Sequence, residues 1–310
     1  MSKNKVYTET QRAEVAAPAA VAFEIINDLR HWPQFFPDGV HAEPDADGAN
    51  VRWWALDGDA VRQWSTTRTV DRAGLRVVTE QAACAAPLVS VRTEWTFAPQ
   101  GEQACEAELT VTVTAAPGAE GADAAAAQLE GAQEIVARVK GLAERWDELA
   151  QLVISFEDPL FIAGQPQQVY EFLYAADKWP ERVPHVTALS MTEDQPGVQF
   201  FDMDTVTPEG RAHTTRSVRV CLPHKIIYKQ IGLPKLLDAH TGHWHFVETP
   251  EGVTVHARHT ATIKPSALNL LGEDTTVADA RRYLRRVLST NSLQTLRHAQ
   301  AYAEEPARAQ

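Results

Sequence analysis

Cysteine is scarce in this 310-residue chain, and its spacing excludes two kinds of small scaffold. Cys84, Cys105 and Cys221 are odd in number and form no Cys-x-x-Cys pair. Neither a disulfide framework nor a zinc finger fits that pattern. We expect all three to be small buried side chains without a redox role.

The sequence also lacks the short motifs of several common enzyme classes. It contains no Gly-x-Ser-x-Gly elbow, no phosphate-binding loop, no Gly-x-Gly-x-x-Gly after a strand and no His-Glu-x-x-His. Hydrolases, kinases and nicotinamide-dependent enzymes are therefore disfavoured. An enzyme that works by shaping an already reactive substrate is still compatible with the sequence.

Excess positive charge and long apolar runs are missing as well. Lys and Arg number 29 against 41 Asp and Glu, which gives a formal net charge of −12. A nucleic acid is not expected as a partner, because binding phosphates needs a clustered basic surface. No run approaches the roughly 18 apolar residues of a membrane span, and the N-terminus has no signal-peptide pattern. We therefore expect no membrane contact and a cytoplasmic location.

What the chain does contain is a second copy of itself. Residues 22–37 (AFEIINDLRHWPQFFP) recur as residues 169–184 (VYEFLYAADKWPERVP). Further on, Thr66-Thr67-Arg68 recurs as Thr214-Thr215-Arg216, and Trp95-Thr96-Phe97 as Trp244-His245-Phe246. This period is domain-sized and far longer than a solenoid repeat of about 20–50 residues. We predict two domains of one fold, residues 1–150 and 151–310.

Both halves show the same order of predicted elements. A strand at about 4–15 precedes a helix that begins after Pro18 and that Trp32-Pro33 breaks into short pieces, and about six strands follow. Ala115–Ala127 is expected to be a loop, and helical spacing from Leu129 to Leu149 predicts one long helix. The second half repeats this order, with a strand near 151–163, helices near 166–183, strands to about residue 264 and a long helix to about residue 303.

Strands in series followed by one long helix indicate an α+β fold. We expect in each half a curved antiparallel sheet wrapped around its long C-terminal helix. A cavity between sheet and helix would suit a small molecule, being apolar with a few polar groups.

The first candidate site lies on one predicted strand. Side chains alternate along a strand, so Trp64, Thr66 and Arg68 share one face. They offer a wall, a hydroxyl and a cation that can stabilise a developing enolate or alkoxide. The competing interpretation is a solvent-facing strand whose Arg pairs with a neighbouring Glu. The recurrence of Thr214 and Arg216 favours the first interpretation, although Ala212 stands opposite Trp64 in the alignment and predicts a differently shaped second pocket.

Histidine is concentrated in the second half, where nine of the 11 occur: His185, His213, His224, His240, His243, His245, His256, His259 and His298. His243 and His245 share one strand face, and His256 and His259 lie on opposite faces. No Cys or carboxylate ligand supports a metal site at this spacing, so no metal is expected. Imidazoles that line a pocket and exchange protons, or ordinary surface and core histidines, are the remaining interpretations.

Two further features have both a structural and a functional interpretation. Arg281-Arg282 and Arg285-Arg286 form a basic patch on the last helix, either a solvated face or a docking surface for an acidic partner. The repeated Trp32-Pro33 and Trp179-Pro180 either close the sheet as aromatic plugs or contact a ligand.

A short helix ending in Trp-Pro-x-x-x-Pro, then Trp-x-x-x-Arg on a central strand, then Glu-Trp-x-Phe resembles the polyketide aromatase/cyclases of the helix-grip superfamily. The tandem copy resembles the di-domain aromatase/cyclases of bacterial type II polyketide synthases. The resemblance implies that a poly-β-ketone on an acyl carrier protein undergoes intramolecular aldol closure of its first ring, in the C7–C12 pattern, and then dehydration. It implies a role for Arg68 in polarising a ketone, which the internal repeat extends to Arg216.

The resulting expectations are specific. Arg68 and Arg216 are the candidate catalytic residues. The candidate substrate-binding residues are Trp32, Trp64, Thr66, Trp95, Trp179, Thr214, His243, Trp244 and His245. We expect no metal and no redox cofactor, an acyl carrier protein as partner, and a homodimer as a further candidate assembly. Two alternatives remain open: a carrier for an apolar ligand that performs no chemistry, and one active domain beside a scaffolding domain.

Overall fold

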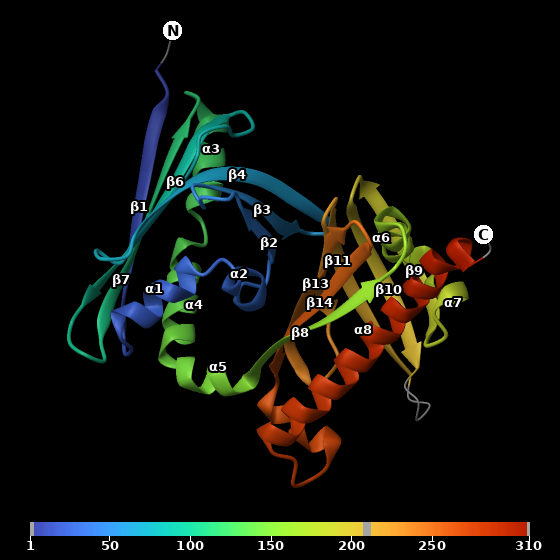
Figure 1. Cartoon of the computed structure of the whole chain (residues 1–310). Coiled ribbons are helices and arrows are strands. Elements are labelled where there is room, and N and C mark those ends of the chain that lie inside the picture. The colour runs from blue at the N-terminus through green and yellow to red at the C-terminus, as the bar shows by residue number, and fades with distance from the viewer. Residues whose placement is uncertain (1–2, 207–211, 309–310) are drawn as a thin grey trace. The chain divides into compact units, whose positions relative to one another are not determined.

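In a computed structural model, which describes the backbone of residues 3–206 and 212–308, the chain divides into two compact units, Met1–Leu149 and Ala150–Gln310. Each unit contains a seven-stranded antiparallel sheet with helices packed on one face (Figure 1). The expected α+β architecture, a curved sheet around a C-terminal helical segment in each of two tandem copies, is confirmed.

The sheet of the first unit is a meander whose first strand pairs with its last. Its order is β1-β7-β6-β5-β4-β3-β2. The strands are β1 (Lys5–Val15), β2 (Gly39–Pro44), β3 (Asn50–Asp57), β4 (Ala60–Asp71), β5 (Arg76–Gln81), β6 (Leu88–Pro99) and β7 (Cys105–Ala115). In β7, buried and half-buried side chains alternate strictly. Leu109, Val111 and Val113 are buried on the inner face, while the threonines between them are half-buried.

The second unit repeats the same order as β8-β14-β13-β12-β11-β10-β9. The strands are β8 (Val153–Ile162), β9 (Val186–Gln195), β10 (Val198–Val206), β11 (Ala212–Leu222), β12 (Lys225–Gly232), β13 (Leu237–Thr249) and β14 (Gly252–Ile263). One difference lies in the turn after the central strand. Four residues separate the paired Asp71 and Arg76 in the first unit, whereas two residues separate Leu222 and Lys225 in the second.

The helices of the first unit depart from the sequence prediction at its C-terminal end. α1 (Ala19–Asn27) and α2 (His31–Phe35) follow β1 as expected. The single long helix predicted over Leu129–Leu149 is instead two helices, α4 (Ala132–Glu144) and α5 (Trp146–Leu152), divided at Arg145. They are preceded by α3 (Ala119–Leu129), and Gly131, whose φ of 92° is left-handed, separates α3 from α4. The loop expected over Ala115–Ala127 is largely α3, since its run of alanines has the highest helix propensity.

The second unit keeps one long terminal helix. α6 (Pro166–Tyr174), η1 (Ala176–Lys178) and α7 (Trp179–Arg182) follow β8, with Pro166 at the first helical position. After β14 come η2 (Pro265–Leu271) and α8 (Val277–Arg308), which packs along β8 and β14 (Figure 1). Its buried apolar side chains are Ala280, Leu284, Leu296, Ala299 and Ala303.

Among the described residues, no helix is both long enough and apolar enough to span a lipid bilayer.

Candidate functional site

The inner face of β4 carries the three residues that alternation predicted. Thr66 is buried, Trp64 and Arg68 are half-buried, and Ser65 and Thr67 between them are exposed. The predicted common face of Trp64, Thr66 and Arg68 is therefore confirmed. Because two of the three keep some exposure, this face is accessible to a molecule from solvent.

A wall of indole rings stands beside this face. Trp53 on β3 stacks on Trp64, with ring centroids 6.2 Å apart and planes 10° apart. Trp32 of α2 meets both edge-on, at 5.0 Å from Trp53 and 6.1 Å from Trp64. Trp53 Nε1 donates to Thr66 Oγ1 at 2.9 Å, which fixes both groups. Trp53 and Trp64 thus present two parallel indole faces and Trp32 stands perpendicular to them, an apolar corner that suits an extended apolar substrate.

Arg68 is held at the end of α1. Its Nη2 donates to the Asn27 carbonyl at 2.8 Å and to Asn27 Oδ1 at 3.0 Å. Asn27 in turn donates to Glu24, which also pairs with Arg72. Desolvation, with repulsion from Arg72, lowers the pKa of Arg68 from its usual range. Within the described residues, Nε and Nη1 of Arg68 make no hydrogen bond, so they can donate to a substrate oxygen.

Sheet pairing identifies the counterpart of Arg68 in the second unit. In the first unit, the pairing of five neighbouring strands places one residue of each strand in a common row across the sheet: Arg68, Thr79, Thr93, Val111 and Glu9. The equivalent strands of the second unit place Arg219, Tyr228, Gly242, His259 and Phe156 in one row. The structural counterpart of Arg68 is therefore Arg219.

Arg219 is completely buried in an aromatic cage. Its guanidinium lies 5.6 Å from the ring centroid of Trp179, 5.7 Å from Phe201 and 5.9 Å from Trp244. Nη2 donates to the Leu173 carbonyl of α6 at 2.7 Å. Nε and Nη1 are buried without a hydrogen-bond partner among the described residues. A buried donor left unpaired typically costs about 1–3 kcal/mol.

The expectation for Thr214 and Arg216 is corrected by this register. Both side chains are exposed on the outer face: Thr214 donates to Asp204, and Arg216 lies 3.8 Å from Asp202. The matching Thr-Thr-Arg letters are 148 positions apart, whereas Arg68 and Arg219 are 151 apart. A slip of three residues moves every side chain to the opposite face. The side chains of Ala212, the expected partner of Trp64, and of His213 lie outside the described residues.

The row continues into a connected group of buried polar side chains on β12, β13 and β14. The Tyr228 hydroxyl lies 2.7 Å from His259 Nδ1, His240 Nε2 lies 3.2 Å from the same atom, and His240 Nδ1 lies 2.8 Å from Gln230 Oε1. His259 Nε2 is buried with no partner among the described side chains. Burial lowers the pKa of His240 to about 4 and, with repulsion from His240, holds that of His259 well below its usual value. Burial also raises the pKa of Tyr228.

The predicted histidines of β13 face the other way. His243 and His245 lie on the outer face, where Glu157 is 4.0 Å from His243 and 2.9 Å from His256. They do not share a face with Arg219, which corrects their expected place in the interior. His256 and His259 do lie on opposite faces, as predicted, with only His259 buried.

The remaining predicted tryptophans are core residues. Trp95 is buried in the first unit and stacks on Phe97 at 5.7 Å. Trp179 and Trp244 are buried in the second unit and meet edge-on at 5.9 Å. These two also form part of the cage of Arg219. The ring that Trp95 contacts is that of Phe97, and it is not part of the wall of Trp32, Trp53 and Trp64.

Sequence reasoning missed Trp53, Arg219, Tyr228 and Gly242, and it singled out no role for His240 or His259. An alignment anchored on the strand ends Asp71 and Leu222, in place of the matching letters, finds Arg219. Among the described residues, no three His, Cys, Asp or Glu side chains are arranged to hold a metal ion.

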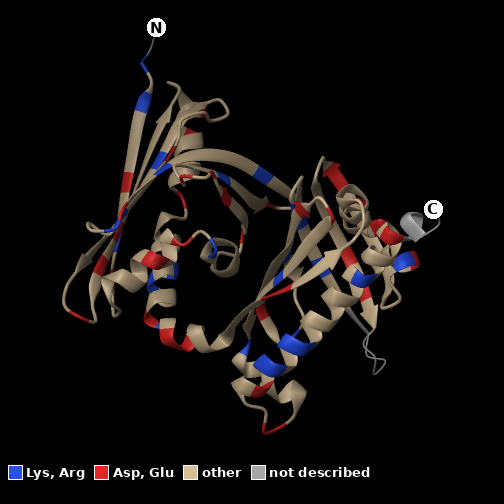
Figure 2. Cartoon of the chain, viewed as in Figure 1, with Lys and Arg blue, Asp and Glu red and all other residues tan. Residues whose placement is uncertain are grey.

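The four arginines of the basic patch on α8 form two pairs, one bound to the neighbouring backbone and strand β8 and one exposed. Figure 2 shows the Lys and Arg positions along α8. Arg281 donates to the carbonyls of Gln151 and Val153, and Arg285 forms a bidentate pair with the buried Asp158. Arg282 and Arg286 are exposed, and Arg282 pairs with Asp279.

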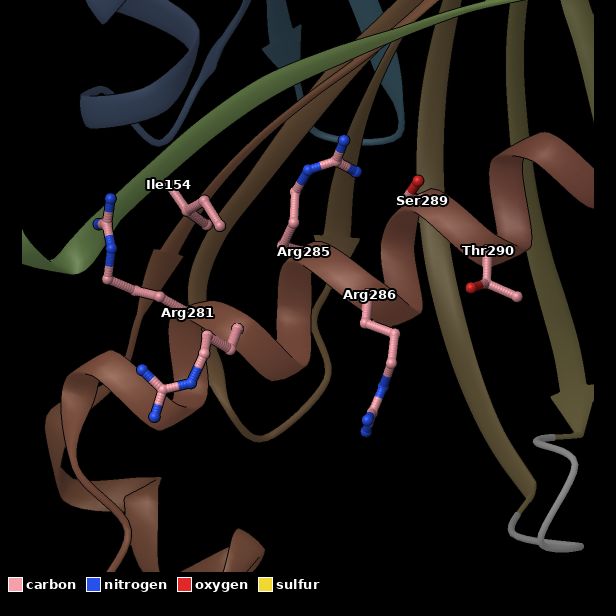
Figure 3. Close-up of a pocket in the computed structure, with 7 residues that line it drawn as sticks. Ile154, Arg281, Arg285, Arg286, Ser289 and Thr290 are labelled. Carbon is pink, nitrogen blue, oxygen red and sulfur yellow. The ribbon is translucent and has the colours of Figure 1, made fainter.

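These four arginines line a surface pocket of about 510 Å³ together with Ile154, Ser289 and Thr290. In Figure 3, Arg285 points toward the strands and Arg286 points away from them. Two carboxylates pair with two of the four guanidinium groups, so the pocket keeps a net positive charge that favours an anion.

Comparison with known proteins identifies the family to which this architecture belongs. The family described as polyketide cyclase / dehydrase and lipid transport matches twice, over residues 8–146 and 162–286. The actinorhodin polyketide synthase bifunctional cyclase/dehydratase of Streptomyces coelicolor is 37% identical, covering 98% of this chain and 99% of that protein. The granaticin counterpart of Streptomyces violaceoruber is 35% identical, covering 96% of this chain and 95% of that protein.

Two solved structures match over nearly the whole length of the chain. StfQ, a di-domain ARO/CYC from the steffimycin biosynthetic pathway, is 52% identical with a TM-score of 0.88. BexL, a di-domain ARO/CYC from the BE-7585A pathway, is 32% identical with a TM-score of 0.86. Each alignment covers 96% of this chain and 99% of the other.

Proposed function

The chain belongs to the polyketide cyclase/dehydrase family as a di-domain aromatase/cyclase, and on that premise we propose that it acts on a poly-β-ketone tethered to an acyl carrier protein. It closes the first ring by an intramolecular C7–C12 aldol condensation and dehydrates the product to an aromatic ring. The observation that carries the proposal is the half-buried Arg68 on one strand face with Thr66 and Trp64.

The inner face of β4 supplies what an aldol closure needs. The substrate is already acidic between its carbonyls, so orientation supplies much of the rate enhancement. The indole wall holds the polyketide substrate folded. The Nε and Nη1 donors of Arg68 stabilise the oxyanion that develops as the new carbon–carbon bond forms. The acidic carbon gives up its proton to solvent before the bond forms, and the alkoxide takes up a proton from solvent afterwards, so the closure consumes no further reagent.

The carrier protein is proposed to dock at the arginine-lined pocket of α8. Carrier domains that bind a cationic surface present acidic side chains and the phosphodiester of their prosthetic arm. The exposed Arg282 and Arg286, with the Ser289 and Thr290 hydroxyls, offer complementary charge and donors. The expected homodimer stays a prediction that sedimentation analysis would check.

Substitution of Arg68 tests the function directly. With the minimal synthase components supplying the carrier-bound chain, Arg68→Ala should lower the yield of the correctly cyclised product about 10²-fold in favour of shunt products. Arg68→Lys should recover only part of it, because the forked donor geometry is lost. Arg12→Ala, which removes an exposed arginine of β1, is the matched control.

The same assay separates this enzyme from a carrier of apolar ligands. A carrier would leave the product distribution equal to that of the synthase alone, with or without Arg68. Wild-type product ratios in a folded Arg68→Ala variant would remove the catalytic assignment.

A further inference from the structure

We infer that the second unit holds a separate acid–base site, in which His259 is the general base and Tyr228 the hydrogen-bond donor for elimination of water from a cyclic β-hydroxy ketone. The inference deepens the proposed function and rests on it, because such a ketone is the product of the aldol step. It assigns dehydration to the interior of the second sheet and leaves ring closure to the Arg68 face.

The hydrogen-bond pattern defines which nitrogen of His259 is the base. Gln230 Oε1 only accepts, so His240 carries its proton on Nδ1 and presents a lone pair on Nε2. His259 Nδ1 is then the donor, and its single N–H is shared between Tyr228 Oη at 2.7 Å and His240 Nε2 at 3.2 Å. The neutral ring therefore keeps its lone pair on Nε2, the atom that is buried without a partner in the described part of the chain.

Tyr228 is placed as a donor by the same network. Its hydroxyl accepts from His259, and its own proton makes only a 3.5 Å contact to the Arg258 carbonyl. That contact is too long for a strong hydrogen bond, so the proton can turn to a substrate oxygen. The ring reaches His259 across β13 only because position 242 is glycine: a Cβ there would collide with the Tyr228 hydroxyl and with the Arg258 carbonyl.

The corresponding row of the first unit offers no such chemistry. Thr79 and Thr93 stand in place of Tyr228 and Gly242, with their hydroxyls 2.6 Å apart, and Val111 stands in place of His259. Arginine is common to both rows, whereas an imidazole base is present only in the second. One scaffold position thus carries a cation with hydroxyls in one unit and a cation with a base in the other.

The elimination balances on these groups without a further reagent. His259 Nε2 removes a proton from the carbon between the ketone and the carbinol, and the enolate oxygen accepts a hydrogen bond from Tyr228. The enolate then expels the hydroxyl group, which takes the same proton from His259 and leaves as water while the carbon–carbon double bond forms. The unpaired Nε–H and Nη1–H of Arg219 can bind another carbonyl oxygen of the substrate, since a poly-β-ketone carries one on every second carbon.

The arginine-lined pocket borders this interior. Ile154, Phe156 and Asp158 share the inner face of β8, and Ile154 lines the pocket. Arg285 lies over Phe156 at 4.2 Å, and Phe156 in turn lies 5.3 Å from His259. The Asp158–Arg285 pair and Phe156 therefore stand between the docking surface and the base, and an anion that binds Arg285 would compete with Asp158 and loosen that barrier.

A synthetic cyclic β-hydroxy ketone tests the site without the carrier protein or the ring-closure step. We expect wild-type enzyme to form the enone, followed by its absorbance above the buffer rate, and His259→Gln to lower that rate about 10²-fold or more. In the full synthase assay, His259→Gln should accumulate a ring-closed product heavier by one water. His256→Gln, on the outer face of the same strand, should change neither readout.

The outcomes separate this site from the proposed function as a whole. Wild-type elimination by a folded His259→Gln variant overturns the inference and leaves the Arg68 assignment intact. A rise in uncyclised shunt products, as expected for Arg68→Ala, would place His259 in ring closure and also overturn it. If His259→Gln does not fold, Tyr228→Phe preserves the ring, and unchanged elimination by that variant is equally contradictory.

Discussion

Arg68 and Arg219 occupy the same position in their two sheets, and each donates a hydrogen bond to a backbone carbonyl near the end of the first helix of its unit, at Asn27 and at Leu173. Their surroundings differ. Arg68 is half-buried beside a wall of indoles, whereas Arg219 is fully buried with two unpaired donors. A shared anchor with different neighbours is the arrangement expected when a duplicated domain keeps its scaffold and changes its chemistry.

The two arginines of β11 should respond differently to substitution. Arg219→Ala removes the guanidinium from the centre of the cage, so we expect the yield of aromatic product to fall about tenfold or more. Arg216→Ala removes an exposed side chain near Asp202 and should leave the yield within about twofold of wild type. Product profiles from the reconstituted synthase measure both.

Stability must be followed alongside, because emptying the cage creates a cavity among Trp179, Phe201 and Trp244. Arg219→Met fills much of that volume without the donors, and its thermal unfolding midpoint gives the comparison. A larger loss of product with Arg216→Ala than with Arg219→Met would restore the assignment made from the matching letters.

The free energy of unfolding should fall in mild acid. Because the pKa of His240 is lowered to about 4 in the folded protein, the unfolded chain takes up a proton first, from about pH 6.5 downward. The stabilisation from the neutral ring is complete above pH 6.5 and is lost as the pH falls toward 4. This group alone should cost on the order of 2 kcal/mol between about pH 7 and pH 5.

Urea unfolding at a series of pH values measures this dependence. The groups that face His240 are Gln230, Tyr228 and His259, and the lowered pKa of His259 acts in the same direction. His240→Asn should flatten the slope, whereas His256→Asn on the outer face should not. An unchanged slope in His240→Asn would mean that the acid sensitivity arises elsewhere.

Carrier-protein binding should depend on the exposed arginines of α8. The double variant Arg282→Glu and Arg286→Glu reverses two charges at the pocket, and we expect the Kd for the carrier protein to rise on the order of tenfold at low salt. Arg297→Glu, an exposed position of the same helix away from the pocket, is the control. Fluorescence anisotropy at low and high salt gives the readout, and equal Kd values for the two variants would refute docking at this pocket.

The duplication, the order of elements along the chain and the family resemblance were predictable, because they depend on patterns that span many residues. Alternation along β4 also placed Trp64, Thr66 and Arg68 on one face correctly. The helix break at Arg145, between α4 and α5, was not predicted, since the apolar positions on its two sides keep helical spacing. Helical spacing tolerates such a break without leaving a trace in the pattern.

The second site was less predictable for two physical reasons. The choice between Arg216 and Arg219 depends on register, which three matching letters specified wrongly by an odd number of residues. The roles of Tyr228 and His259 depend on contacts between β12 and β14 across Gly242, and no spacing along the chain reveals which side chains meet over a glycine.

The shorter turn between β11 and β12 has a consequence for comparing the two halves of this chain. The turns differ by two residues, an even number, so equivalent residues still point to the same face of the sheet in both halves. Only the number of residues that separates equivalent positions changes. The halves correspond at a separation of 151 on β4 and β11 (Arg68 and Arg219) and of 149 on β6 and β13 (Trp95 and Trp244). Roles assigned in one half should be transferred to the other with an offset determined separately for each pair of strands.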